Sequence, residues 1–187
     1  MKICILGAGA LGCSIGGVLA RGGSDVIFVD HFQAHVDAIN TNGLKMRLGD
    51  TEETVRIKAY TSSDGLQPVD LVIVLVKSAA TRAAIESARP LIGPDTLVMS
   101  IQNGLGHERI LAEVVGREHV LAAKTYVGGV FLEPGHIVSG YKGKQTYIGE
   151  LDGRLTPRLQ AVVDEFNKAD LLATASNNIY GTMWDKL

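Results

Sequence analysis

A glycine-rich turn near the N-terminus constrains the fold of this chain more than any other feature. The turn, residues 7–12 (GAGALG), follows a short apolar run at residues 2–6 and opens a stretch with helical spacing that extends through Leu19. A second apolar run, residues 25–30, ends in Asp30. This order is typical of a strand, a tight turn, a helix and a second strand parallel to the first. The sequence therefore predicts an α/β fold of the Rossmann type, with a doubly wound parallel sheet.

Each glycine of the turn has a mechanical role in such a unit. Gly7 allows the tight turn, Gly9 lets the backbone approach a diphosphate, and Gly12 lets the helix pack against its strand. Ala10 and Leu11 lie where the helix begins, and free N–H groups and the helix dipole favour a negative charge there. We therefore expect these five residues to bind the diphosphate of a nicotinamide dinucleotide. A glycine-rich turn without a ligand is the alternative.

Asp30 bears on the choice of cofactor. It lies 18 residues after Gly12, at the end of the second predicted strand. A carboxylate at this place accepts hydrogen bonds from the adenosine ribose hydroxyls and repels a 2′-phosphate. NAD(H) is therefore favoured over NADP(H), although His31, Lys45 or Arg47 could support a phosphate.

Composition and charge favour a small molecule as the binding partner. The 187 residues carry 18 Lys and Arg against 20 Asp and Glu, a formal net charge of −2, and the basic residues form no cluster. This argues against a nucleic acid or a membrane as partner. The uncharged stretch 3–20 is long enough to span a membrane, but its five glycines would make a poor membrane helix. Cys4 and Cys13 are too few for a disulfide scaffold, so we expect buried thiols and a cytoplasmic protein.

Two polar residues are predicted to lie at the carboxyl edge of the sheet. The apolar run 71–76 is followed by Lys77, and the mainly apolar run 96–101 is followed shortly by Asn103. Ligands of open α/β sheets bind outside the carboxyl ends of the strands. We expect Lys77 to offer a positive charge and Asn103 an amide donor and acceptor beside the cofactor. For each residue the alternative is a polar strand end that contacts water.

The remaining segments predict further elements. The expected elements are a helix at 32–42, a hairpin of strands 44–48 and 55–60 around Gly49-Asp50, an antiparallel meander added to the sheet from residue 120 with turns at Pro134-Gly135 and Gly143, a helix at 156–168 and a strand at 171–175. His31 and His35 have the spacing of a metal pair on a helix, but no third ligand is near, so a solvated helix face is favoured.

The last ten residues, 178–187, predict a helix capped by Asn177. Asn178, Thr182 and Lys186 recur every four residues and would form a polar stripe beside an apolar one. Spacing alone favours an ordinary exposed position for Lys186.

Four motifs, in order along the chain, resemble those of the ketopantoate reductases (2-dehydropantoate 2-reductases). They are GAGALG at 7–12, LVKS at 75–78, QNGLG at 102–106, and NN followed by WDKL at 184–187. The resemblance implies the reduction of a branched 2-keto acid to pantoate, a step towards pantothenate and coenzyme A. It implies that Lys186 is the general acid that protonates the carbonyl oxygen, with Asn103 and Lys77 beside the nicotinamide and the substrate. The family's usual cofactor is NADP(H), with a basic residue where this chain has Asp30.

In the family that the chain resembles, the sequence continues past the position of Lys186 into an all-helical domain. We therefore expect residues 1–175 to form the dinucleotide-binding domain, and residues 176–187 to form the first helix leading into a C-terminal helical domain that this sequence lacks. The expected partner is a small 2-keto acid, and the sequence leaves open whether the protein forms a homodimer. The alternatives are another two-domain NAD(P)-dependent 2-hydroxyacid or hydroxyacyl dehydrogenase, and a non-catalytic NAD(H)-binding regulatory module. A short-chain dehydrogenase is disfavoured, because Tyr141 is followed four residues later by Gln145 and not by Lys.

Overall fold

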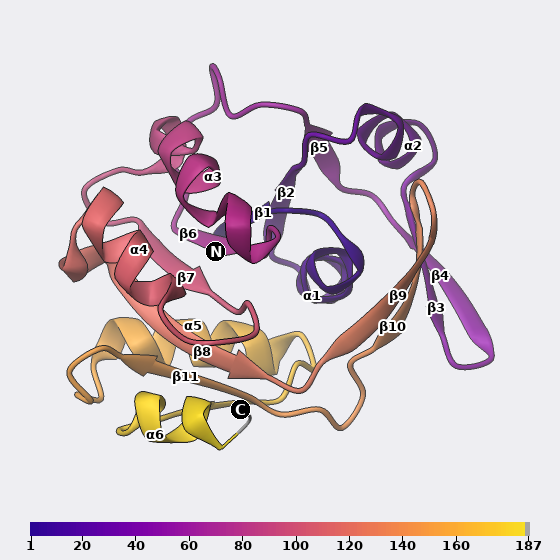
Figure 1. The fold of residues 1–187 in the computed structure, drawn as a ribbon. Helices are drawn as coiled ribbons and strands as arrows, with labels where there is room; N and C mark the ends of the chain where they lie inside the picture. The colour runs from indigo at the N-terminus through magenta and orange to yellow at the C-terminus, as the bar shows by residue number, and fades with distance from the viewer. Residues whose placement is uncertain (186–187) are drawn as a thin grey trace.

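A computed structural model describes residues 1–185, which form two β-sheets with helices between and outside them (Figure 1). The larger, eight-stranded sheet contains, in spatial order, β12 (Ala173–Ala175), β11 (Thr146–Glu150), β8 (Val120–Thr125), β7 (Leu97–Ser100), β6 (Leu71–Val74), β1 (Lys2–Leu6), β2 (Asp25–Val29) and β5 (Lys58–Tyr60). The smaller, four-stranded sheet contains β4 (Thr51–Val55), β3 (Leu44–Leu48), β10 (His136–Gly140) and β9 (Gly128–Glu133). The helices are α1 (Ala10–Arg21), α2 (Gln33–Asn42), α3 (Thr81–Ser87), α4 (His107–Val115), α5 (Pro157–Lys168) and α6 (Ile179–Trp184), with short 3-10 turns η1 (Ser78–Ala80), η2 (Arg89–Leu91) and η3 (Arg117–His119).

The larger sheet confirms the predicted fold class. The strands from β8 through β7, β6, β1 and β2 to β5 are all parallel to their neighbours. β11 then adds to β8 in the antiparallel direction and is followed by β12. All four residues of β6 are buried, as expected for a strand covered on both faces. The protein is thus a Rossmann-type α/β fold with an added antiparallel section.

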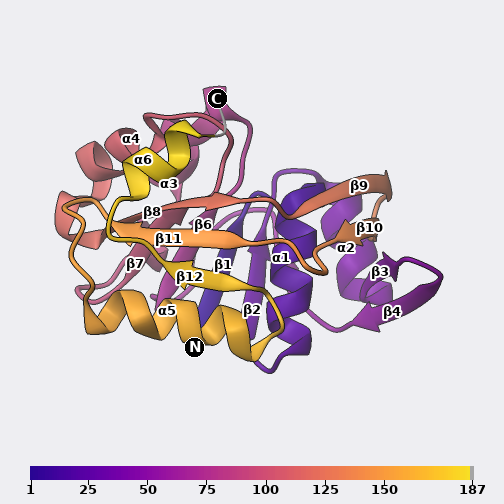
Figure 2. The ribbon, with the colours of Figure 1, turned by 90° about the horizontal axis from the view of Figure 1, so that it is seen from below.

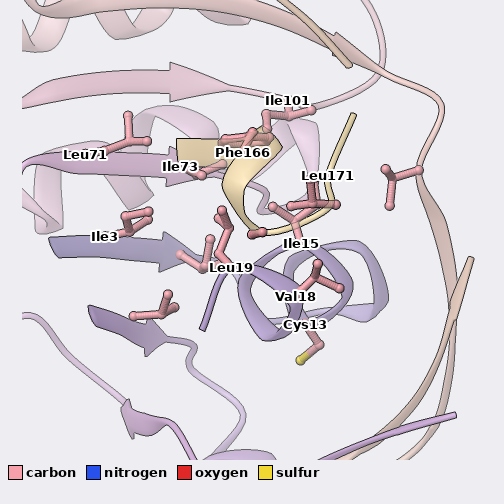
Figure 3. Packing of buried hydrophobic residues seen from close by; sticks show 14 of the residues in the cluster. Ile3, Cys13, Ile15, Val18, Leu19, Leu71, Ile73, Ile101, Phe166 and Leu171 are labelled. Carbon is pink, nitrogen blue, oxygen red and sulfur yellow. The ribbon is translucent and has the colours of Figure 1, made fainter. Parts of the chain in front are cut away.

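Helices cover both faces of the larger sheet (Figure 2). On one face α1 and α5 pack on the strands, with Ile15 and Phe166 in a buried apolar cluster that also contains Ile3 and Ile73 (Figure 3). On the other face α3, α4 and α6 supply Ile85, Leu111, Ile179 and Met183 to a second cluster. Burial of these apolar side chains on both faces is the main stabilising contribution to the sheet.

Helix α1 lies between the two sheets, and adjacent glycines make this possible (Figure 1). A Cβ on Gly16 would lie 2.4 Å from a ring carbon of Phe28 in β2, and a Cβ on Gly17 would lie 2.3 Å from the sulfur of Met46 in β3. The uncharged stretch 3–20 is therefore β1 followed by this buried helix. No helix within residues 1–185 is long and apolar enough to cross a membrane.

The predicted hairpin at Gly49-Asp50 is present, but its second strand is not the expected one. β3 pairs with β4, and Leu48 lies opposite Thr51, so the connection has two residues and the return strand begins at once. Residues 58–60, which we assigned to the hairpin, form β5 instead and run parallel to β2. Within 55–60, Val55 ends β4 of the smaller sheet, whereas residues 58–60 form the edge strand of the larger one.

The predicted meander after residue 120 is divided between the sheets. β8 and β11 belong to the larger sheet, and they pair antiparallel as expected. The hairpin of β9 and β10 turns at Gly135, with φ +78°, and joins the smaller sheet through β10 and β3. The expectation that the whole meander extends the main sheet was wrong, because α1 packs between this hairpin and the main sheet.

The C-terminal elements follow the predictions with shifted ends. Thr156 caps α5, and the last strand begins at Ala173 rather than at residue 171. The cap of α6 is Asn178 and not Asn177, because the Asn178 side chain accepts a hydrogen bond from the Gly181 N–H at 3.1 Å. Lys186, the predicted general acid, lies outside the described residues.

Candidate dinucleotide and substrate site

The glycine loop has the tight geometry that its sequence predicts. Gly7 has φ +101°, and a Cβ there would lie 2.6 Å from the backbone nitrogen of Val76. A Cβ on Gly12 would lie 2.1 Å from the carbonyl oxygen of Gly7. Gly9 differs, because a Cβ there would meet no atom within 4 Å. Gly7 and Gly12 are therefore required by packing within the protein, whereas Gly9 faces open space that a ligand could occupy.

The N-terminus of α1 offers donors to that open space. The helix has no side-chain cap at Gly9 and no acidic residue in its first turn. The first α-helical backbone bond there runs from the Cys13 N–H to the Gly9 carbonyl at 2.8 Å. The N–H groups of Ala10, Leu11 and Gly12 precede that bond and have no partner within the helix. Free donors and the positive end of the helix dipole suit a diphosphate, so the loop fits a dinucleotide.

The Asp30 carboxylate is hydrogen-bonded to the glycine loop. Its Oδ2 accepts a hydrogen bond from the Ala8 N–H at 2.7 Å, and its Oδ1 accepts one from the Phe32 N–H at 2.9 Å. The side chain is 13% exposed, while that of the neighbouring His31 is 98% exposed. The carboxylate therefore stands at the end of β2 beside the loop, and each oxygen keeps acceptor capacity for a further donor.

His35 also contacts the glycine loop, a role that the sequence did not predict. It is 1% exposed, and its Nδ1 accepts a hydrogen bond from the Gly135 N–H at 2.9 Å. Nε2 therefore carries the proton and donates to the Ala8 carbonyl at 2.8 Å. Burial lowers the pKa of His35, because it disfavours the charged imidazolium. The solvated-face reading of His31 and His35 is thus wrong for His35.

The two cysteines are buried thiols, as predicted. Burial raises the pKa of Cys4 to about 12. Burial, together with the nearby charge of Asp30, raises the pKa of Cys13 further, and its thiol donates to the Ala8 carbonyl at 3.0 Å. Both side chains stay protonated at neutral pH and contribute packing.

Lys77 and Asn103 follow neighbouring strands at the carboxyl edge, as predicted. β6 and β7 are parallel, with Val74 opposite Ser100, so the segments after them leave the sheet side by side. Lys77 is exposed and precedes η1, and Asn103 is exposed and lies before α4. Their shared edge is the one reached by the glycine loop after β1, since the Leu75 N–H donates to the Leu6 carbonyl at 2.8 Å.

Gln102 holds these two strand ends together, a role that was not predicted. Its Nε2 donates to the Val76 carbonyl at 2.6 Å and to Thr81 Oγ1 at 2.9 Å. Its Oε1 accepts from Ser100 Oγ at 2.9 Å. The residue is 8% exposed, so the amide acts as a buried connector between the β6 and β7 ends. The QNGLG motif was the only sequence signal for it.

A cavity of about 350 Å³ opens at this edge, beyond β7 and β8. Its lining comes from three segments: residues 101–104 after β7, the end of β8, and α6. The lining residues are Ile101, Gln102, Asn103, Gly104, Ala123, Lys124, Thr125 and Met183. Asn103, predicted from sequence, thus belongs to the cavity, whereas Lys124 was missed. The volume suits a small organic acid rather than a macromolecule.

The described residues 1–185 contain no group of three His, Cys, Asp or Glu side chains placed to hold a metal ion. The glycine loop, Asp30 and the cavity lie at the carboxyl edge of one Rossmann-type sheet, the arrangement in which such folds bind a dinucleotide beside a second ligand. Comparison with known proteins gives the particular family. The family described as ketopantoate reductase PanE/ApbA matches residues 3–153, and the chain belongs to this family.

Individual relatives agree with that assignment. The 2-dehydropantoate 2-reductase of Pyrococcus horikoshii is 39% identical over 187 residues, which cover all of this chain and 60% of the relative. The enzyme of the same name from Streptococcus pyogenes serotype M1 is 30% identical over 186 residues, again covering 60% of the relative. The chain therefore spans about 60% of the length of these curated relatives.

Solved structures share the fold. The 2-dehydropantoate 2-reductase of Geobacter metallireducens superimposes with a TM-score of 0.91 at 31% identity, covering all of this chain and 61% of that one. D-mandelate dehydrogenase in a ternary structure with NADH and anilino(oxo)acetate superimposes with a TM-score of 0.91 at 27% identity, covering all of this chain and 60% of that one.

Proposed function

We propose that this chain is the dinucleotide-binding part of a reductase that converts 2-dehydropantoate into pantoate. The observation that carries the proposal is the pairing of an open, donor-rich glycine loop at Gly9 with a cavity at the carboxyl ends of β7 and β8. Membership of the ketopantoate reductase family supports the choice of reaction. The substrate class is a branched 2-keto acid.

The residues have separate roles in the proposed reaction. When bound, the reduced nicotinamide supplies a hydride to the ketone carbon of the substrate. Lys186 gives a proton to the carbonyl oxygen, so that the ketone becomes a secondary alcohol; an ammonium is protonated at neutral pH and suits this task. Asn103 lines the cavity and orients the substrate, and Lys77 adds positive charge beside the nicotinamide. The role of Lys186 rests on the family resemblance and on the WDKL motif that contains it.

Gly7, Gly9, Ala10, Leu11 and Gly12 hold the diphosphate, and Asp30 selects the cofactor. We propose NAD(H) as the preferred cofactor, although the family resemblance implies NADP(H). Asp30 stands at the end of β2, and its carboxylate can accept hydrogen bonds from the ribose hydroxyls while repelling a 2′-phosphate.

A second candidate is an NAD-dependent 2-hydroxyacid dehydrogenase with a different substrate. The likeness to D-mandelate dehydrogenase in its complex with NADH favours it, together with the carboxylate of Asp30. A regulatory module that binds NAD(H) without chemistry is the remaining alternative, and it predicts no effect of Lys186 on turnover.

We further propose that residues 1–175 form the dinucleotide-binding domain and that residues 176–187 lead into a helical domain. A cytoplasmic location and a homodimer remain predictions. The 60% coverage of the curated relatives is consistent with the domain proposal.

The test is substrate-dependent oxidation of NADH and NADPH by the natural full-length protein. We expect turnover of 2-dehydropantoate with NADH preferred, and a loss of about 10²- to 10⁴-fold in kcat for Lys186→Ala with NADH binding unchanged. Turnover of mandelate-type 2-oxo acids alone would favour the second candidate. Tight NADH binding without turnover of any 2-oxo acid would favour the regulatory module.

A further inference from the structure

Lys124 is a charged residue inside a strand that is buried along its whole length. All six residues of β8 are buried, and Lys124 is 6% exposed. The residue lines the cavity at the carboxyl edge, together with Asn103. Helix α6 packs against β8, and the Lys124 side chain reaches this helix. A cation is thus placed on the wall of the cavity assigned to the substrate.

The described residues 1–185 give this ammonium little compensation. Its Nζ donates one hydrogen bond, to the Thr182 carbonyl at 2.6 Å, and lies 5.0 Å from the centre of the Tyr126 ring. Within residues 1–185, no carboxylate forms an ion pair with Lys124. An ammonium has three donors, and a buried charge without a counter-ion is costly. A bound anion would offset that cost.

We propose that Lys124 binds the carboxylate of the substrate. The inference rests on the proposed function and sharpens it, because it makes a free carboxylate next to the ketone a requirement for binding. Lys124 stands on β8 and Asn103 follows β7, so the two residues contact the substrate from neighbouring strands of one cavity. Lys77 cannot substitute, since it is exposed, follows β6 and does not line this cavity.

A structural role for Lys124 makes a different prediction. If the ammonium served only to hold the Thr182 carbonyl near the end of α6, its removal would lower the stability of the protein and affect charged and uncharged ligands alike. A substrate-binding role predicts a selective loss for ligands that carry a carboxylate. The discriminating quantity is therefore the preference for an acid over its uncharged amide.

The experiment uses the natural full-length protein with NADH bound. Binding and turnover of 2-dehydropantoate and of 3-methyl-2-oxobutanoate are measured against the primary amide of each acid. NADH fluorescence reports cofactor binding. The variants are Lys124→Met, which keeps the apolar stem without the charge, and Lys124→Arg, which keeps the charge. Lys142→Met, at an exposed lysine outside the cavity, is the matched control.

We expect the wild type and Lys142→Met to prefer each acid over its amide by roughly 30-fold or more, the effect of a buried charge pair. Lys124→Met should lose most of this preference through a higher KM for the acid, with unchanged NADH affinity, and Lys124→Arg should recover part of it.

Turnover with an unchanged preference in Lys124→Met would overturn this inference but not the proposed function. A wild type that reduces 2-oxo acids without preferring acid over amide would also overturn it, even if the variants fail to fold. A wild type that binds NADH but neither binds nor reduces any 2-oxo acid would overturn the proposed function as well.

Discussion

The glycine loop and the cavity at the carboxyl edge serve one proposed reaction but are built in different ways. The loop consists of the backbone of contiguous residues 7–12, and two of its glycines are required by backbone atoms of the loop or of the segment that follows β6. The cavity is lined by residues 101–104 after β7, by the end of β8 and by Met183 of α6, so its wall comes from three separate segments of the chain. Backbone sites of the first kind leave a local motif, whereas sites of the second kind depend on packing between distant segments.

The largest expected effect concerns Gly12, where the loop packs most tightly. A methyl group in Gly12→Ala would approach the Gly7 carbonyl, so the loop must shift. We expect a loss of about 3 kcal/mol in the free energy of unfolding, the upper range for overpacking, together with weaker NADH binding. Urea unfolding measures the first and a fluorescence titration the second. Unchanged stability would contradict the close approach of Gly12 to the Gly7 carbonyl.

A substitution at Gln102 tests the connections beside the cavity. Gln102→Leu removes the bonds to the Val76 carbonyl and Thr81, so the partly buried Val76 carbonyl loses its side-chain donor. We expect a loss of about 2 kcal/mol in the free energy of unfolding and a higher KM for the substrate. Gln33→Leu, at an exposed glutamine on α2, is the control and should change stability by less than about 0.5 kcal/mol. Equal effects of both variants would contradict the connector role.

Gly9 separates ligand binding from folding within the loop. Since a Cβ there meets no protein atom within 4 Å, Gly9→Ala should leave the free energy of unfolding within about 0.5 kcal/mol of the wild type. The same methyl group would lie where the diphosphate approaches, so the NADH dissociation constant should rise about tenfold, or about 1.4 kcal/mol. Normal NADH affinity in this variant would place the cofactor elsewhere.

The smallest expected effect is a pH dependence from His35. Its pKa is lowered in the folded protein, so the unfolded chain binds a proton first as the pH falls through about 6.5. Stability should therefore decrease between about pH 7 and the folded pKa, and then level off. We expect this slope to be smaller in His35→Gln and unchanged in His31→Gln, where the ring is exposed. Urea unfolding at several pH values provides the measurement, and identical slopes in all three proteins would refute the assignment.

Much of the fold was predictable because local patterns matched the final elements. The apolar runs at β1, β2 and β6 indicated buried parallel strands, and the roles of Gly7 and Gly12 followed from the turn alone. The strand that pairs with β3 was predicted wrongly because residues 51–55 and 58–60 are both short and partly alternating. The first segment joins the smaller sheet and the second joins the larger one. Local alternation does not reveal which sheet a strand will join.

The candidate site was predictable only in part. Lys77 and Asn103 could be placed because strand ends of a parallel sheet share one edge. Lys124 could not, since a lysine in a short strand usually faces solvent, and its burial depends on α6, nearly sixty residues later. His35 was misread for a similar reason, because the turn of β9 and β10 that covers it lies a hundred residues away.

The most direct test of the whole account is a crystal structure of the natural full-length protein with NADH and a 2-oxo acid. We predict that the diphosphate lies against the backbone at Gly9 and the N-terminus of α1, and that the carboxylate of the acid lies within hydrogen-bonding distance of Lys124 Nζ. The ketone should then face Asn103 and the nicotinamide. An acid bound outside the cavity, or a dinucleotide away from the glycine loop, would contradict the account.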